Sequence, residues 1–181
     1  FDSPVVYSFD EEGNNAKEVT ISDDGSKLLI TDDDRGVQLI DISNLSDLQK
    51  IWETGPSIAN DAIFLGDNHI VESQSSYWNG HPYDDGIYHD RFNIYSIENG
   101  YPEEISSQSI FVDGEGYNDE YGSNLELAVT DDLSKLFVSA SSLGIWSYDI
   151  SNPNAIKEIG SIQGNWGIKD ISLGENDSIL F

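Results

Sequence analysis

Apolar, β-forming residues recur along the chain in short runs, separated by turns of Asp, Asn, Gly and Ser. A first run at 18–22 leads into the turn Asp-Asp-Gly-Ser, whose residues tolerate turn geometry, and a second run at 27–31 returns. This pattern predicts a β-hairpin. A third strand is expected at 36–42, and a fourth, more polar strand at 48–53 has the composition of an outer edge.

The segment 17–44 returns at 125–152 without a gap. Eleven of the 28 aligned positions are identical, and most of the others exchange one β-forming residue for another. The offset of 108 residues is too long for one such unit, so it is expected to contain two. A weaker copy is present at 60–73 and 92–99, and another copy opens at 169–181. Repeats of roughly 40 to 50 residues built only of strands are typical of propeller blades.

The predicted fold class is therefore all-β, a β-propeller of four-stranded antiparallel blades. The expected blades span 17–55, 58–112 and 125–163, a fourth starts at 169–181, and 1–12 is expected to be the outer strand of a preceding or closing blade. About three and a half blades cannot close a ring, since propellers need about four to eight. We expect a longer parent chain or neighbouring subunits to supply the remainder.

Two segments carry a resemblance to a known family. GVQLIDISNLSDLQKI (36–51) and GIWSYDISNPNAIKEIG (144–160) resemble the LVIVD repeat, whose pattern is Gly, aliphatic residues and Asp-Ile-Ser, then Asn or Asp and Pro, and an outer strand. The resemblance implies a β-propeller of a kind common in bacterial or archaeal surface and secreted proteins, with no catalytic signature attached to the repeat. Glu98 and Asn99 depart from this pattern in the second blade.

Asp41 and Asp149 occupy equivalent positions of the repeat, each following a strand and preceding Ile-Ser-Asn. A carboxylate at such a position can accept hydrogen bonds from the backbone of the following turn. We therefore expect both side chains to have a structural role and to hold the entry to the outer strand.

The charge balance is strongly acidic. With 34 Asp and Glu against 8 Lys and Arg the formal charge is −26, yet 38% hydrophobic residues leave enough apolar material for packed sheets, so this is not a disordered tail. We interpret the acids as a solvated anionic surface. Nucleic acid and anionic membranes need Lys and Arg clusters, so neither is an expected partner. A high-salt or marine source would screen the self-repulsion.

Several functional classes lack their sequence signals. The chain has no cysteine, which excludes disulfides, thiol catalysis and thiolate metal sites. It has no apolar run long enough to span a membrane and no visible signal peptide. The motifs GxSxG, P-loop and GxGxxG are absent, and three histidines provide few general bases. Of these, His69 lies in the hairpin turn Gly-Asp-Asn-His and is interpreted as a turn residue.

Function is expected where added residues interrupt the repeat, at 73–91 and at 113–124. The first segment lies between the second and third strands of blade two, and the second lies between blades two and three. In a propeller both kinds of connection leave the same face. The two segments are therefore expected to form one crown, and loops on a rigid sheet scaffold are where binding usually occurs.

The first segment combines candidate metal ligands with aromatic side chains. The candidate ligands are His81, Asp84, Asp85, His89 and Asp90. The residues that could stack on a sugar or a peptide are Tyr77, Trp78, Tyr83 and Tyr88. The spacing of the two histidines matches no short zinc motif. A polar loop packed onto the sheet by its aromatic residues is the simpler interpretation.

The second segment offers oxygen ligands of the kind that Ca²⁺ prefers. They are Asp113, Glu115, Asp119 and Glu120. The segment does not fit an EF-hand, because Asn118 and Asn124 stand where the turn glycine and the bidentate glutamate belong. Calcium is thus a candidate cofactor, against the alternative of a solvated acidic loop. The run 32–34 of three aspartates is a weaker candidate, interpreted as a solvated turn.

The sequence favours a noncatalytic extracellular or cell-surface β-propeller module with a structural role or an interaction role toward proteins or glycans. Propellers also carry enzymes, so the fold alone does not exclude catalysis. The alternative is a propeller enzyme of the hydrolase or lyase type, with a metal-dependent or carboxylate site on the crown formed by 73–91 and 113–124.

Overall fold

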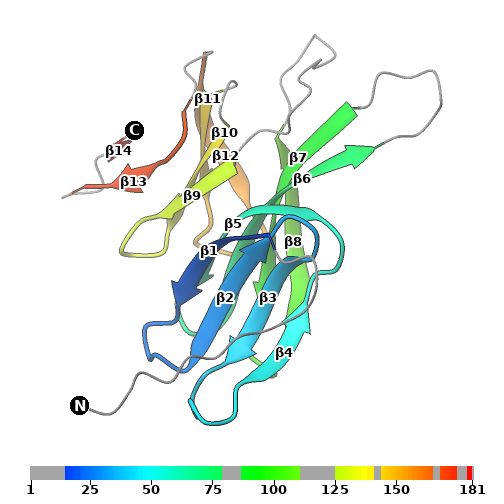
Figure 1. Ribbon diagram of the computed structural model, residues 1–181. Helices are drawn as coiled ribbons and strands as arrows, with labels where there is room; N and C mark the ends of the chain where they lie inside the picture. The colour runs from blue at the N-terminus through cyan, green and yellow to red at the C-terminus, as the bar shows by residue number, and fades with distance from the viewer. Residues whose placement is uncertain are drawn as a thin grey trace.

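The computed structural model describes residues 15–78, 87–110, 125–140, 144–164, 168–174 and 179–180. All regular structure in these ranges is β-structure, arranged as three four-stranded sheets and one two-stranded piece (Figure 1). No helix long and apolar enough to cross a membrane occurs in this part of the chain.

The strands of each sheet follow chain order, and every neighbouring pair is antiparallel. Sheet 1 contains β1 (Ala16–Ile21), β2 (Lys27–Asp32), β3 (Gly36–Asp41) and β4 (Gln49–Glu53). Sheet 2 contains β5 (Ile58–Leu65), β6 (His69–Trp78), β7 (Ile87–Ser96) and β8 (Glu103–Ile110). Sheet 3 contains β9 (Leu125–Val129), β10 (Lys135–Ala140), β11 (Gly144–Asp149) and β12 (Lys157–Gln163). The short piece pairs β13 (Ser172–Leu173) with β14 (Ile179–Leu180).

The sheets pack face to face in chain order, through three apolar clusters. The cluster between sheets 1 and 2 includes Leu29, Leu39, Ala62, Ile70 and Tyr95. The cluster between sheets 2 and 3 includes Val71, Phe92, Ile94, Leu127, Leu136 and Tyr148. The third joins sheet 3 to the following segment through Ala128, Ile145, Ile168 and Ile171. Sheets 2 and 3 are therefore buried on both faces, and this explains why their strands are only partly alternating.

The first strand of each sheet lies against the first strand of the next, so that β1 contacts β5 and β5 contacts β9 (Figure 1). The prediction of an all-β fold built from four-stranded antiparallel sheets is confirmed. The arrangement is consistent with a β-propeller-like fold, and no ring closes among the described residues.

The identical residues of the repeat make equivalent turn hydrogen bonds. In the hairpin turn of sheet 1 the backbone N–H of Ser26 donates to Asp24 at 2.9 Å, and in sheet 3 that of Ser134 donates to Asp132 at 3.0 Å. The hydroxyl of Ser22, followed by the donors of Ser26, lowers the pKa of Asp24 to about 2. Matching donors lower the pKa of Asp132 to about 2. The repeat therefore preserves the groups that fix its turns.

The predicted role of Asp41 and Asp149 is confirmed. Asp41 accepts a hydrogen bond from the backbone N–H of Ser43 at 2.9 Å, and Asp149 accepts one from the backbone N–H of Ser151 at 3.0 Å. Hydrogen bonds from the side chain and the backbone of the following serine lower the pKa of each carboxyl. Both aspartates thus close the turn that leads into the outer strand.

Replacing Asp149 by alanine is expected to lower the melting temperature by about 2 °C, because the turn loses its acceptor while remaining open to water. Thermal unfolding followed by circular dichroism measures the change. Asp131→Ala is the matched control, since Asp131 is exposed in a turn of the same sheet and accepts no hydrogen bond from the described residues. Equal melting temperatures for the two variants would remove the structural role of Asp149.

The interpretation of the run 32–34 as a solvated turn is wrong for Asp32, which is only 1% exposed. Its carboxylate accepts hydrogen bonds from the backbone N–H groups of Asp34 at 2.8 Å, Arg35 at 3.0 Å and Asn15 at 3.1 Å. These donors replace water around the charge, so the side chain can lie inside the turn that it closes.

Candidate functional site

Three carboxylates meet where the first strands of the three sheets run side by side. They belong to Glu18 on β1, Asp61 on β5 and Glu126 on β9, and one oxygen of each lies within 4.8 Å of the others. We call this group the inner acid cluster. Glu18 is exposed, Glu126 is partly buried and Asp61 is buried, so the cluster extends from solvent into the protein.

The three acids occupy corresponding places in their sheets. In each sheet, the residue paired with the acid on the second strand carries a hydroxyl group. The pairs are Glu18 with Thr31, Asp61 with Ser73, and Glu126 with Ser139. The hydroxyl of Thr31 accepts a hydrogen bond from the backbone N–H of Glu18 at 3.0 Å, and that of Ser73 accepts one from Asp61 at 3.1 Å. The repeat thus brings an acid to the same register three times.

A local irregularity precedes two of the acids. The pairing of β1 with β2 shifts between Ala16 and Glu18, and that of β5 with β6 shifts between Ala59 and Asp61. Such bulges re-aim the next side chain relative to the regular pleat. They contribute to the convergence of carboxylates from separate sheets.

Asp61 is the buried member of the cluster, at 3% exposure. Its Oδ2 accepts a hydrogen bond from the backbone N–H of Leu127 at 2.8 Å, whereas its Oδ1 has no hydrogen-bond partner among the described residues. Burial, followed by the charge of Glu18, raises the pKa of Asp61 to about 8. The folded protein therefore holds this carboxyl in surroundings that favour its neutral form.

The pKa of Glu126 is also raised. Burial raises the pKa of its carboxyl to about 7, and the negative charges of Glu18 and Asp170 contribute after burial. Asp170 lies in the segment whose sequence aligns with the start of β1, where it corresponds to Glu18. A fourth acid of the repeat is thus close enough to act on the cluster.

Serine hydroxyls lie beside the cluster, between the sheets. Ser73 Oγ donates a hydrogen bond to the backbone carbonyl of Leu125 at 2.7 Å and so joins sheet 2 to sheet 3. The corresponding Ser139 Oγ is fully buried and has no hydrogen-bond partner among the described residues. Because residues paired directly across antiparallel strands face the same side, Ser139 lies on the face of Glu126.

Most of the predicted crown residues lie outside the described part of the chain. These are His81, Tyr83, Asp84, Asp85, Asp113, Glu115, Asp119 and Glu120. Tyr77, Trp78, Tyr88 and His89 belong to the described backbone, where Tyr77 pairs with Tyr88 and Trp78 with Ile87, while their side chains lie outside the described part.

The expectation of added loop residues throughout 73–91 is wrong at both ends of the segment. β6 continues to Trp78 and β7 begins at Ile87, with an unbroken antiparallel register between them. Tyr, Trp and Ile favour extended strands, and the ladder hydrogen bonds continue through them. Part of the predicted insertion is therefore an elongated hairpin.

Asp90 is the one predicted ligand of the crown whose side chain the structure describes. It is 6% exposed and accepts a hydrogen bond from Ser75 Oγ at 2.7 Å, and Ser75 Oγ accepts one from Asn60 Nδ2 at 3.0 Å. This carboxylate belongs to a buried polar network inside sheet 2. Its backbone pairs with Ile110, so the connections after β6 and after β8 leave from the same end of the sheet.

Glu72 is a further buried acid that the sequence analysis did not identify. Glu72 on β6 is 1% exposed and accepts hydrogen bonds from Tyr95 Oη at 2.9 Å and Thr54 Oγ1 at 3.3 Å. Burial raises the pKa of its carboxyl. Because both oxygens have donors, Glu72 links sheets 1 and 2 and is not open to a ligand.

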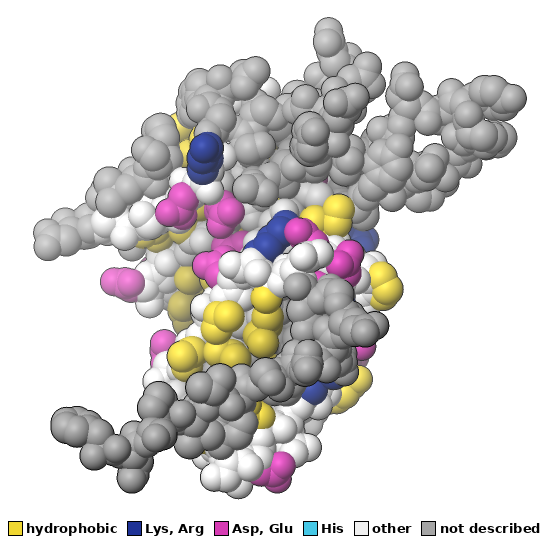
Figure 2. Space-filling view, in the orientation of Figure 1, with side chains coloured by type: hydrophobic (Ala, Val, Ile, Leu, Met, Phe, Trp, Pro, Cys, Tyr) yellow, Lys and Arg dark blue, Asp and Glu magenta, His cyan; other side chains and the backbone are white. Residues whose placement is uncertain are grey.

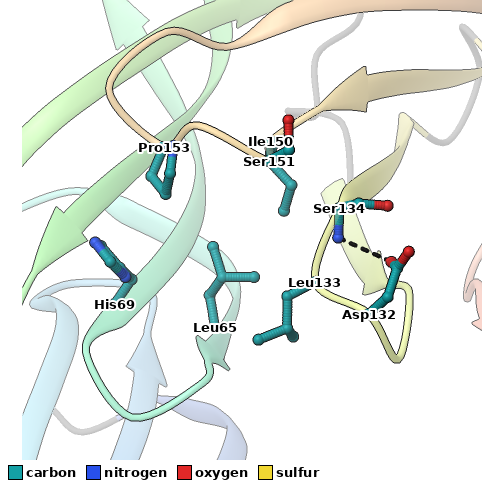
Figure 3. A pocket seen from close by; sticks show the side chains of 8 residues that line it. All are labelled: Leu65, His69, Asp132, Leu133, Ser134, Ile150, Ser151 and Pro153. Atoms are coloured by element: carbon teal, nitrogen blue, oxygen red, sulfur yellow. Dashed lines mark hydrogen bonds between the residues drawn. The ribbon is translucent and has the colours of Figure 1, made fainter.

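A cleft of about 290 Å³ lies between the turns of sheets 2 and 3 (Figure 3). It is lined by Leu65, His69, Asp132, Leu133, Ser134, Ile150, Ser151 and Pro153. The Asp132 side chain already accepts the hydrogen bond from Ser134 drawn there. Leu133 has a positive φ of 57° and lies against Gly66 of the facing turn. The cleft is thus built from turn-forming groups and presents no converging reactive side chains.

The inner acid cluster was also missed, although part of its signal is visible in the sequence. Glu18 and Glu126 are identical across the repeat and stand inside otherwise β-forming strands, where the turn argument does not apply. Asp61 and Asp170 stand at the same position in the weaker copies that begin at 60 and 169. A charged residue that is repeated within a first strand would have been the signal to follow.

No family model matches the chain, and no curated protein matches it. Solved structures do. A functionally unknown protein from Desulfotomaculum acetoxidans aligns at 17% identity and a TM-score of 0.48, over 93% of this chain and 63% of that one. An auxiliary nutrient binding protein from Bacteroides thetaiotaomicron aligns at 12% identity and a TM-score of 0.50, over 90% of this chain and 35% of that one. The chain thus spans less than two thirds of the length of either protein.

Proposed function

We propose that this chain is a segment of a β-propeller and serves as a noncatalytic interaction module at the cell surface or outside the cell. The observation that carries the proposal is an apolar face that no other described strand covers. The outer face of sheet 1, on the side away from sheet 2, exposes hydrophobic side chains over β1 and β2 (Figure 2).

The repeat identifies what such a face normally contacts. Val19 and Ile21 on β1 are 57% and 58% exposed. Their counterparts at the same repeat positions, Leu127 and Val129 on β9, pack into the cluster between sheets 2 and 3, and Leu127 is 6% exposed. In sheet 3 this face is therefore covered by sheet 2. In sheet 1 no described strand covers the equivalent face. We infer that a further four-stranded blade of the same kind covers sheet 1.

The hydrogen bonds of the buried and repeated carboxylates support an interaction role over a catalytic one. The aspartates that the repeat preserves in its turns accept backbone hydrogen bonds, as for Asp24, Asp41 and Asp149. Glu72 and Asp90 are held in buried networks. These carboxylates have structural partners, and the partner we propose for the module is a protein or a glycan.

One further feature supports a location outside the cell, namely that the repeats resemble those of surface and secreted proteins. The solved nutrient-binding structure is compatible with a binding role, but at 12% identity its likeness concerns the fold alone. Labelling intact cells of the source organism with a membrane-impermeant biotin reagent tests the location. A protein that stays unlabelled while known surface proteins are labelled would contradict it.

Sedimentation velocity of this 181-residue chain tests the open face. Because the blade that we infer is of the same repeat, a second copy can supply a substitute in solution. We expect the average mass to increase with protein concentration in about 1 M NaCl, where salt screens the acidic surfaces. The variant Val19→Thr, Ile21→Thr keeps β-branched residues and is expected to remain monomeric.

The matched control is Leu45→Thr, Tyr101→Thr, where the replaced side chains lie in connections between strands and are 63% and 61% exposed. This variant should associate like the parent. A parent that stays monomeric at every concentration would contradict the need for a covering blade, and so would equal loss of association in both variants.

A further inference from the structure

The inner acid cluster has the composition and geometry of a cation site. We propose that Glu18, Asp61 and Glu126 bind a hard divalent cation, with Ca²⁺ as the best match. The site is separate from the uncovered face of sheet 1, so it does not depend on the proposed function. It also differs from the acidic segment 113–124.

The distances between the carboxylates fit one ion. An oxygen from each of the three residues lies within 4.8 Å of the other two. Ca²⁺ binds oxygens at about 2.3 to 2.6 Å, so two of its ligands can be up to about 5 Å apart. The three oxygens can therefore contact one cation with small adjustments of the exposed Glu18 side chain.

The unpartnered oxygen of Asp61 is an independent indication of a ligand. Asp61 is 3% exposed, and its Oδ1 has no hydrogen-bond partner while Oδ2 is occupied by the N–H of Leu127. Buried polar atoms normally have partners, because an unsatisfied one costs about 1 to 3 kcal/mol. In the metal-free protein the neutral Asp61 carboxyl shares its proton with Glu18, and this hydrogen bond also raises the pKa of Asp61. A cation in the cluster would take the place of that proton and bind Oδ1, which accepts no hydrogen bond from the described residues.

No basic side chain of the described residues neutralises the cluster by an ion pair. Lys17 is adjacent to Glu18 in sequence, but its Nζ pairs with the carboxylate of Asp33. The charge of Lys17 lowers the pKa of Glu126, but burial and repulsion among the acids outweigh it, so the pKa values of both Asp61 and Glu126 are raised. A divalent cation would reverse this repulsion.

The donor set determines the class of metal. The cluster contains three carboxylates and no histidine or cysteine, and oxygen-only sites prefer Ca²⁺ or Mg²⁺ over softer metals. Ca²⁺ accepts six to eight ligands in flexible geometry and can complete its shell with water. The exposed side of Glu18 provides the route for the ion and for these waters.

Calorimetric titration of CaCl₂ into the chain, after removal of metals with EDTA, tests the proposal. The titration is run at about pH 8.5 so that the carboxyls ionise, in about 1 M NaCl to suppress diffuse binding to the acidic surface. We expect one Ca²⁺ per chain and a rise in melting temperature on binding. Asp61→Asn and Glu126→Gln should each weaken the affinity at least about tenfold, since each removes one charged ligand.

Two controls separate this site from other acids. Asp67→Asn removes one exposed charge from a turn and should leave the affinity unchanged. The variant Asp113→Asn, Glu115→Gln, Asp119→Asn should retain binding if the inner cluster is the site. Circular dichroism verifies that each variant folds. Absence of both heat and thermal stabilisation in the parent would overturn the proposal, as would undiminished binding by Asp61→Asn.

Discussion

In metal-free buffer, the protein is expected to become less stable as the pH rises from about 5 to about 8. The cause is Asp61, whose pKa is raised from 3.8 to about 8 in the folded chain. Between these values folded Asp61 retains a proton that the unfolded chain has released. The folded state then binds more protons, so the free energy of unfolding falls with increasing pH. Glu126, raised from 4.5 to about 7, contributes in the same direction.

Asp61→Asn is expected to flatten this dependence and to stabilise the metal-free protein at pH 8 by on the order of 2 to 4 kcal/mol. Urea unfolding at pH 5 and pH 8 measures the effect. Ordinary carboxyls have largely ionised by about pH 5. Burial also raises the pKa of Glu72, and this group remains in both proteins, so the difference between parent and variant isolates the contribution of Asp61. The control Asp67→Asn removes an exposed charge and should preserve the slope of the parent. A parent equally stable at both pH values would exclude a buried, proton-holding Asp61.

Gly144→Ala is expected to destabilise the protein by about 3 kcal/mol or more. Gly144 has a φ of 129°, which L side chains rarely adopt, and a Cβ there would overlap the carbonyl oxygen of Ile162 on β12. The equivalent Gly36 has a φ of 75°, and a Cβ there would meet Thr54 and the carbonyl of Gly55. In sheets 1 and 3 the third strand therefore needs glycine as its first residue, because the end of the fourth strand lies too close for a Cβ.

Urea unfolding of Gly144→Ala, compared with Gly160→Ala, measures this effect. A Cβ at Gly160 meets no atom within 4 Å, so that variant should change the free energy of unfolding by less than about 1 kcal/mol. Gly36→Ala should behave like Gly144→Ala. If the Gly144 and Gly160 variants were equally stable, the close approach of β11 and β12 at Gly144 would be wrong.

The sheets could be predicted because their determinants are local and repeated. Alternating runs of β-forming residues and Asp, Gly and Ser turns specify hairpins, and the second copy of the repeat tests each assignment. Asp41 and Asp149 were predictable for the same reason, since their hydrogen bonds go to the second residue that follows. Gly36 and Gly144 are identical in the repeat because a Cβ at either position would meet atoms at the end of the neighbouring strand. This contact could not be predicted from the sequence.

The candidate site could not be predicted in the same way, because it is formed by residues from three different sheets. Nothing local indicates that Glu18, Asp61 and Glu126 share a surface, and Asp61 is placed by a bulge in the strand pairing. The burial of Asp32 also depends on backbone donors that a turn presents only once it is formed. The expected loop at 73–91 overlooked that Tyr77 and Trp78 favour continuation of the strand.

A crystal structure of the natural protein in which this chain occurs tests the central claim most directly. The account predicts that a further four-stranded antiparallel sheet packs on Val19 and Ile21. It also predicts that the first strands of all blades surround one axis beside Glu18, Asp61 and Glu126. An outer face of sheet 1 that is open to solvent or covered by a helix, with the sheets in an open stack, would contradict the assignment of this chain as a propeller segment.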